Sequence, residues 1–243
     1  MHTLFWSKEL MEYIEERNQL LEIVNLLWKR QYADSTGICV SQRVDQNLVL
    51  VDTTGTGYRR CKDDINDLIL IDLKGDLKQT WSNHERGAPV NVIIALNMYR
   101  NYSELKACVH CHSVYSNAFA IAGKPIPRDH ETLQRKLVGD VPCIIIDDRL
   151  EKQKMNEEGI VYDIPSGIHT RQDVFHVMNM VGLEAVQLFE SRKEEMFCHG
   201  IAFTHFEHGL FALGRNLGEA FSTFERVERG AQSWLLAKSA GII

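Results

Sequence analysis

Two histidines separated by a single residue close a short apolar segment of the chain, Lys106-Ala-Cys-Val-His-Cys-His112. The apolar run before the histidines predicts a β-strand. Because successive side chains of a strand point to opposite faces, His110 and His112 would share one face and could bind one metal ion together. This segment therefore requires a fold in which a strand presents both imidazoles next to a third ligand.

The third ligand must come from another part of the chain, and one later segment offers three histidines: His199, His205 and His208. His199 and His208 are each followed by glycine, which allows the backbone to approach a bound ion closely. Spacing alone does not choose between the three. Catalytic zinc usually has three protein ligands and one open position, so the sequence predicts a zinc centre, with iron(II) or manganese as alternatives.

The same segment contains a Cys-x-x-Cys pattern, formed by Cys108 and Cys111. Residues three apart in a strand point to opposite faces, and the chain has no second such pattern that would complete a zinc ribbon. We therefore expect buried, reduced thiols and no redox pair. The start of the sequence lacks the basic region and apolar run of a secretion signal, which favours a cytoplasmic protein.

The remaining sequence predicts an α/β protein. Helical spacing of apolar residues predicts helices at residues 9–30, 91–101, 115–122, 173–195 and 217–238. Short aliphatic runs predict strands at residues 48–51, 68–73, 106–112, 143–147 and 200–206. We expect the charged residues 147–158 to form a solvated excursion. No linker composition divides the chain, so we predict a single domain over residues 1–243.

Charge and hydropathy restrict the partners. The chain carries 33 acidic and 27 basic residues, a formal net charge of −6, and its lysines and arginines form no block. This pattern argues against a nucleic-acid partner. No apolar stretch approaches the roughly 20 residues of a membrane span. A small-molecule substrate is the partner that remains.

Longer motifs around the histidines resemble one known family. After the His-x-His strand comes a short helical segment, Ser113-Val-Tyr-Ser-Asn-Ala118. Much later, His208-Gly209 is followed by Gly214 and by the helix start Leu217-Gly-Glu-Ala220. This arrangement is similar to the class II aldolase/adducin family, which includes zinc-dependent sugar-phosphate aldolases and ribulose-phosphate 4-epimerases. Residues 123–127 and 139–143 resemble the epimerase branch in particular.

The resemblance implies an α/β/α domain with a central, mainly antiparallel sheet flanked by helices. It assigns the metal to His110, His112 and His208, and so selects His208 over its two neighbours. Members of this kind usually form fourfold tetramers with the active site at a subunit junction. The resemblance therefore also implies a homo-oligomer, a tetramer in the family's manner.

The family pattern also implies residues that bind the substrate. Ser41-Gln-Arg43 matches the end of a turn motif, and Thr54 with Gly55 matches a loop that binds a substrate phosphate. These matches assign substrate contacts to Arg43, Thr54 and Gly55.

The chain departs from the family pattern at the positions that bind substrate and move the proton. The family's proton-moving carboxylate is replaced by Asn91, which can hydrogen-bond but cannot accept a proton near neutral pH. Pro89 and Val90 replace two serines that bind phosphate, and Cys39 replaces an asparagine. We therefore assign Asn91 to substrate orientation and expect the base to be another group. Its candidates are Glu131, Tyr115 and His84.

Three functions agree with these residues. The first is a zinc-dependent lyase or isomerase that acts on a small hydroxy-carbonyl or sugar-like substrate through a metal-stabilised enediolate. The second is a three-histidine iron or manganese decarboxylase or oxygenase on the same frame. The third is a non-catalytic descendant that keeps the metal as a binding element.

Overall fold

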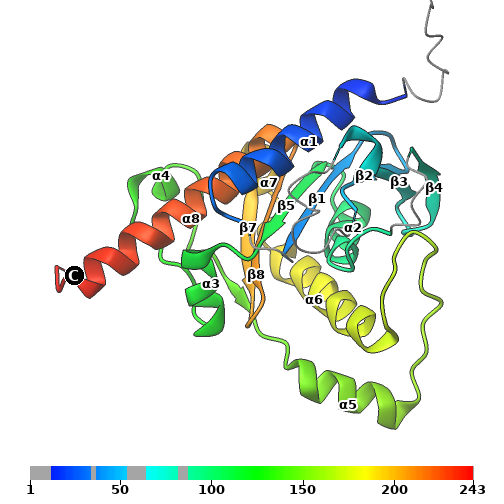
Figure 1. Cartoon of the computed structure of the whole chain (residues 1–243). Helices are drawn as coiled ribbons and strands as arrows, with labels where there is room; N and C mark the ends of the chain where they lie inside the picture. The colour runs from blue at the N-terminus through cyan, green and yellow to red at the C-terminus, as the bar shows by residue number, and fades with distance from the viewer. Residues whose placement is uncertain (1–11, 34–36, 54–63, 82–86, 243) are drawn as a thin grey trace, which may run out of the picture.

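Helices cover one central sheet of strands in the computed structural model, which describes residues 12–33, 37–53, 64–81 and 87–242 (Figure 1). The strands are β1 (Ile38–Arg43), β2 (Leu48–Val51), β3 (Ile69–Asp72), β4 (Leu77–Thr80), β5 (Ala107–Cys111), β6 (Cys143–Ile144), β7 (Ile201–His205) and β8 (Gly209–Gly214). The helices are α1 (Ile14–Lys29), α2 (Val92–Asn101), α3 (Val114–Ile121), α4 (Glu131–Gln134), α5 (Asp148–Glu158), α6 (Gln172–Glu190), α7 (Glu195–Cys198) and α8 (Leu217–Ser239), with a 3-10 turn at Ile65–Asp67. None of the helices in these ranges is long and apolar enough to span a membrane.

The sheet confirms the expected architecture. Its strand order is β4-β3-β2-β1-β5-β8-β7-β6, and every neighbouring pair is antiparallel except β6 with β7. The strand β5, which carries His110 and is followed directly by His112, lies in the middle of the sheet between β1 and β8. A central strand is fixed by hydrogen bonds on both edges, which makes it a rigid support for a site.

Helices cover both faces of the sheet and enclose two apolar cores. One core lies under α2 and α6, and the other lies under α1, α3 and α8 (Figure 1). The strand β5 contributes to both, because Cys108 faces the first core and Cys111 the second. This confirms that the two cysteines point to opposite faces. Burial raises the pKa of the Cys108 thiol, which further opposes redox chemistry there.

The charged segment after β6 differs from expectation. Residues 148–158 form the helix α5, and Asp147 is its N-terminal cap. The side chain of Asp147 accepts hydrogen bonds from the backbone N–H groups of Arg149 and Leu150 at 2.9 and 3.0 Å. Gly159 ends the helix in the left-handed conformation, with φ of 65°. Met155 is the buried residue of this helix. The charge pattern therefore predicted the exposure of this segment correctly but did not predict that it forms a capped helix.

Three strands have no counterpart in the sequence prediction: β1, β4 and β8. The strand β8 is a short apolar run between two glycines, and periodicity does not separate such a run from a loop or a helix turn. It lies between β5 and β7, and backbone pairing with both neighbours stabilises it as a strand although its sequence pattern does not predict one.

Candidate metal centre

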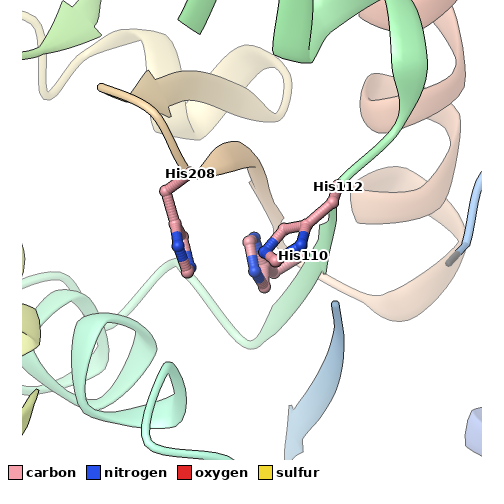
Figure 2. A group of neighbouring side chains, drawn as sticks. All are labelled: His110, His112 and His208. Carbon is pink, nitrogen blue, oxygen red and sulfur yellow. The ribbon is translucent and has the colours of Figure 1, made fainter. Parts of the chain in front are cut away.

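Three histidines converge at one end of the central strands. Each of His110, His112 and His208 offers one ring nitrogen, and these nitrogens all lie within 4.8 Å of one another (Figure 2). The rings of His110 and His208 are parallel, with centroids 5.1 Å apart. The ring of His112 stands at 74° to the first and 73° to the second. The three residues that the sequence assigned to the metal are thus brought together by the fold.

His110 is held in one tautomer and one orientation. Its Nδ1 donates a hydrogen bond to the backbone carbonyl of Leu210 at 2.9 Å, so the neutral ring carries its lone pair on Nε2. The ring also stacks on Phe211, the residue paired with it across the sheet, at a centroid distance of 4.0 Å. A carbonyl partner on the second ring nitrogen is the usual support of a metal-binding histidine. His110 is therefore prepared to bind an ion through Nε2.

His112 follows the last residue of β5, and two glycines make room for its ring. A Cβ atom at Gly37 would lie 2.3 Å from Cγ and Nδ1 of His112. A Cβ atom at Gly209 would lie 2.9 Å from Cδ2 of the same ring and 3.2 Å from Cε1 of His110. Both positions therefore require glycine for steric reasons. The role of Gly209 agrees with the sequence interpretation, whereas that of Gly37 was missed.

His208 lies in the tight turn that joins β7 to β8. His205 and Gly209 form the last pair of these strands, and three residues connect them. The middle one, Glu207, adopts the left-handed conformation with φ of 55°, as three-residue hairpin loops commonly require. Because β8 is the neighbour of β5, the turn brings His208 next to His110.

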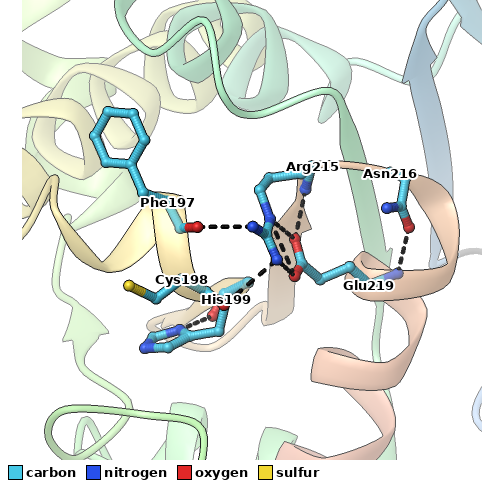
Figure 3. Close-up of polar contacts among 7 residues, drawn as sticks. Phe197, Cys198, His199, Arg215, Asn216 and Glu219 are labelled. Carbon is cyan, nitrogen blue, oxygen red and sulfur yellow. Dashed lines mark hydrogen bonds and ion pairs between the residues drawn. The ribbon is translucent and has the colours of Figure 1, made fainter.

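The two competing histidines lie in different places. His199 precedes β7 at the opposite end of the strand from His208. There Arg215 binds the segment to the end of β8, since its guanidinium donates to the carbonyl oxygens of Phe197 at 2.7 Å and Cys198 at 3.3 Å (Figure 3). His199 is therefore remote from the three-histidine group. The geometry agrees with the choice of His208 over His199.

His205 lies beside the centre but outside the group of converging nitrogens. Its ring centroid is 5.5 Å from that of His208, and its side chain is 1% exposed. Burial lowers the pKa of His205 to about 4, and the backbone of Ile146 opposes this shift more weakly. The imidazole is therefore neutral at neutral pH.

A buried carboxylate supports the segment after His112. Glu228 of α8 is 2% exposed and accepts hydrogen bonds at the start of α3. Its donors are the hydroxyl of Ser113 at 2.9 Å and the backbone N–H groups of Tyr115 and Ser116 at 2.9 and 2.8 Å. A carboxylate at a helix N-terminus satisfies backbone donors that the helix itself leaves unpaired. Sequence spacing gave no sign of this contact, because Glu228 is 115 residues away from Ser113.

The predicted substrate residues are not gathered around the histidines. Arg43 ends β1, whereas Cys39, four residues earlier, is the partner of His110 in the sheet. At about 3.3 Å per residue, Arg43 is roughly 13 Å farther along the strand. Its guanidinium donates to the carbonyl oxygens of Gln46 and Tyr99, the latter at 3.2 Å. These contacts favour a structural role for Arg43, and its contact with substrate stays a prediction.

Asn91 stands at the N-terminus of α2, and its side chain caps no backbone group of that helix. Its Oδ1 is buried and has no hydrogen-bond partner among the described residues. An amide in this state is able to bind a ligand, as expected for a residue that orients substrate. Thr54 and Gly55 lie outside the described residues.

The structure also locates two of the three candidate bases. Glu131 forms an ion pair with Arg135 at the surface, and both side chains are about 70% exposed or more. Tyr115 belongs to α3 and packs partly against the core under α8. His84 lies outside the described residues. Within the part of the chain that the structure describes, the three-histidine group contains no carboxylate.

A cavity of about 420 Å³ borders the turn that carries His208. It is lined by Ile146, Asp147, Asp148, Arg149, Phe206 and Glu207. Burial raises the pKa of Asp148, the ammonium of Lys152 3.8 Å away opposes this shift, and the nearby Asp147 and Glu207 add to it. Three carboxylates against one guanidinium give this surface a negative character.

The donor set suits a divalent ion of borderline softness. Neutral imidazoles are good ligands for zinc, and three protein ligands leave a position for water or substrate. The residues present therefore fit a catalytic type of zinc site.

Comparison with known proteins identifies similar sequences and folds. Residues 18–235 match the sequence model of the family described as "Class II Aldolase and Adducin N-terminal domain". An L-fuculose 1-phosphate aldolase has the same fold with a TM-score of 0.69, at 19% identity over 94% of this chain and 88% of the other.

Two further solved structures show the same likeness. The L-fuculose-1-phosphate aldolase of Thermus thermophilus gives a TM-score of 0.64 at 17% identity, over 93% of this chain and 95% of the other. A putative aldolase/epimerase/decarboxylase from Escherichia coli gives 0.61 at 19% identity, over 92% and 89%. At these identities the likeness concerns the fold.

Proposed function

Because the chain belongs to the class II aldolase and adducin family, we propose that it is a zinc-dependent lyase or isomerase acting on a small hydroxy-carbonyl or sugar-like compound. Members of the family are mostly enzymes and typically metal-dependent lyases. The observation that carries the proposal is the convergence of His110, His112 and His208 at one end of the sheet.

The residues of the centre have distinct tasks in this proposal. When bound, the ion would supply Lewis-acid polarisation of the substrate carbonyl. His110, His112 and His208 would hold it through neutral imidazoles, and the Leu210 carbonyl fixes the tautomer of His110. Asn91 would orient the substrate through its amide, since it cannot take up a proton near neutral pH. The proton would go to another group.

The charge near the centre favours a substrate without phosphate. The cavity beside His208 is lined by Asp147, Asp148 and Glu207, with Arg149 as the cation among its lining residues. Carboxylates repel a phosphate dianion. In addition, Pro89 and Val90 offer no hydroxyl groups for a phosphate to accept from.

We also propose a homo-oligomer in which α3 lies at a subunit contact. Val114 and Ile121 occupy the same face of this helix, two turns apart, and are 69% and 60% exposed. The helix begins two residues after His112, so a neighbouring subunit placed there would lie close to the centre. The resemblance to the family implies a tetramer, and the proposal extends that assembly to this chain.

One observation favours a second function, a non-catalytic metal-binding protein. The group contains no carboxylate from the described ranges, and Asn91 stands where the family has its proton-moving acid. A centre of this kind would bind an ion without moving protons.

An activity assay separates the two functions. Zinc-loaded protein is incubated with ketoses in matched phosphorylated and unphosphorylated pairs, and both aldehyde release and the appearance of sugar isomers are measured, with the His208→Ala variant as control. We expect cleavage or isomerisation of unphosphorylated substrates that the variant lacks. No activity on any ketose of the panel would favour the non-catalytic function. Protein that purifies with iron and consumes oxygen would contradict zinc lyase chemistry.

A further inference from the structure

His205 is a buried imidazole whose ring nitrogens are incompletely hydrogen-bonded. It ends β7, is 1% exposed, and neither Nδ1 nor Nε2 has a hydrogen-bond partner of normal geometry among the residues that the structure describes. Leaving a buried polar group without a hydrogen bond is costly, so native structures nearly always provide a partner. The backbone of Ile146 makes a weak hydrogen-bond contact with the ring, which can serve one of the two nitrogens at most. A partner for at least one ring nitrogen is therefore expected from outside the described residues.

The position of His205 places that partner at the three-histidine centre. Alternation along β7 puts His205 on the same face as Phe203, which stacks on Phe211, the neighbour of His110. His205 pairs with Gly209, and the side chain that Gly209 lacks would meet the rings of His112 and His110, so the end of β7 lies directly beside the centre. The ring centroid of His205 is 5.5 Å from that of His208, at an interplanar angle of 51°.

The same geometry sets His205 apart from the ligands. The nitrogens of the three ligands lie within 4.8 Å of one another, and His205 does not belong to this group. Because the His205 ring lies beside the His208 ring and outside the three-histidine group, it is suitably placed to contact a molecule bound at the centre and not the ion itself.

We propose that His205 is a substrate-binding residue that hydrogen-bonds an oxygen atom of the compound held at the three-histidine centre. The inference rests on the proposed function and extends it. Imidazole nitrogens can donate a hydrogen bond through N–H or accept one through a lone pair, which matches a hydroxyl or carbonyl oxygen. This chemistry suits a hydroxy-carbonyl compound.

The test uses a probe that resembles such a compound. Cobalt(II) is added to the metal-free full-length protein, and its visible spectrum reports both ion uptake and the binding of acetohydroxamate. Three variants are compared with the wild type: His205→Phe, which keeps the ring shape without nitrogen, His205→Gln, which keeps a donor and an acceptor, and His199→Phe, a control at the other end of β7.

We expect His205→Phe to bind cobalt within about threefold of the wild type but acetohydroxamate about five- to tenfold more weakly, as for one lost hydrogen bond. His205→Gln should recover part of this loss, and His199→Phe should show none. Equal acetohydroxamate affinity in wild type and His205→Phe would overturn the inference. So would a roughly hundredfold loss of cobalt affinity in His205→Phe, because His205 would then be a ligand. A wild type that takes up no cobalt would instead contradict the proposed function, before any variant is compared.

Discussion

The backbone carbonyl of Leu210 accepts a hydrogen bond from Nδ1 of His110 at 2.9 Å. The donor is on β5 and the acceptor is on β8, so the pairing of these two strands also fixes the tautomer of the His110 ring. The residue before Leu210 is Gly209, whose missing side chain gives room to His112. One strand therefore orients the first histidine, makes space for the second and follows directly after the third, His208.

Substitution of the glycines beside His112 should weaken ion binding. In Gly37→Ala the new Cβ would lie 2.3 Å from the His112 ring, and in Gly209→Ala it would lie 2.8 Å from the Cys111 carbonyl oxygen. Either the ring or the backbone must move, and we expect about a tenfold or greater loss of zinc affinity in titration calorimetry, the size seen when the support of a ligand is altered.

Gly139→Ala is the matched control for these variants. A Cβ at this position would meet nothing within 4 Å, so zinc affinity should stay at the wild-type value. Wild-type affinity in Gly37→Ala, with an unchanged circular dichroism spectrum, would show that His112 is not held where the structure places it.

Replacing the buried carboxylate of α8 should affect both stability and ion binding. Glu228→Gln keeps one acceptor oxygen but turns an amide NH₂ toward the donors at the start of α3. We expect a loss of about 2–4 kcal/mol in the free energy of unfolding of the metal-free protein, measured by urea denaturation. Zinc affinity should fall by about tenfold, since Ser113 follows His112 directly.

Glu225→Gln, three residues earlier on α8, provides the comparison. Glu225 binds Arg30 and the hydroxyl of Tyr32 with its side chain 30% exposed. Its loss should cost less than about 1 kcal/mol and leave zinc affinity unchanged. Equal effects of the two substitutions would remove the special role assigned to Glu228.

Charge on the exposed face of α3 should disrupt the proposed assembly. The double variant Val114→Asp, Ile121→Asp places two carboxylates where the subunit contact is proposed, and burying unpaired charges is costly. Sedimentation velocity should show an oligomer for the wild type and a monomer for this variant. Val161→Asp, at a side chain that is 81% exposed elsewhere on the chain, should leave the oligomer intact. A monomeric wild type would refute the assembly.

Local pattern was sufficient to predict which three histidines the fold brings together, and their role as metal ligands stays a prediction. The alternation of β5 placed His110 and His112 together, and the family motif around His208 selected it over His199, which the structure places at the far end of β7. Contacts between distant segments were not accessible in this way. The approach of Gly37 to His112, the contact of Glu228 with Ser113 and the burial of His205 all depend on strand order and helix packing.

Arg43 makes contacts that motif matching does not predict. The family pattern assigns it to substrate, which stays a prediction, and within this chain its guanidinium donates to the carbonyl oxygens of the neighbouring turn and of Tyr99. A motif transfers residue types, whereas a role also depends on which groups the fold places around them.

The most direct test of the account is zinc binding by the metal-free protein and its His208→Ala and His199→Ala variants, measured by titration calorimetry. We predict one zinc ion per chain for the wild type and for His199→Ala, and a loss of affinity of about a hundredfold or more for His208→Ala, which removes one of three ligands. A wild type without stoichiometric zinc binding, or a His208→Ala variant that binds zinc as tightly as the wild type, would contradict the three-histidine centre.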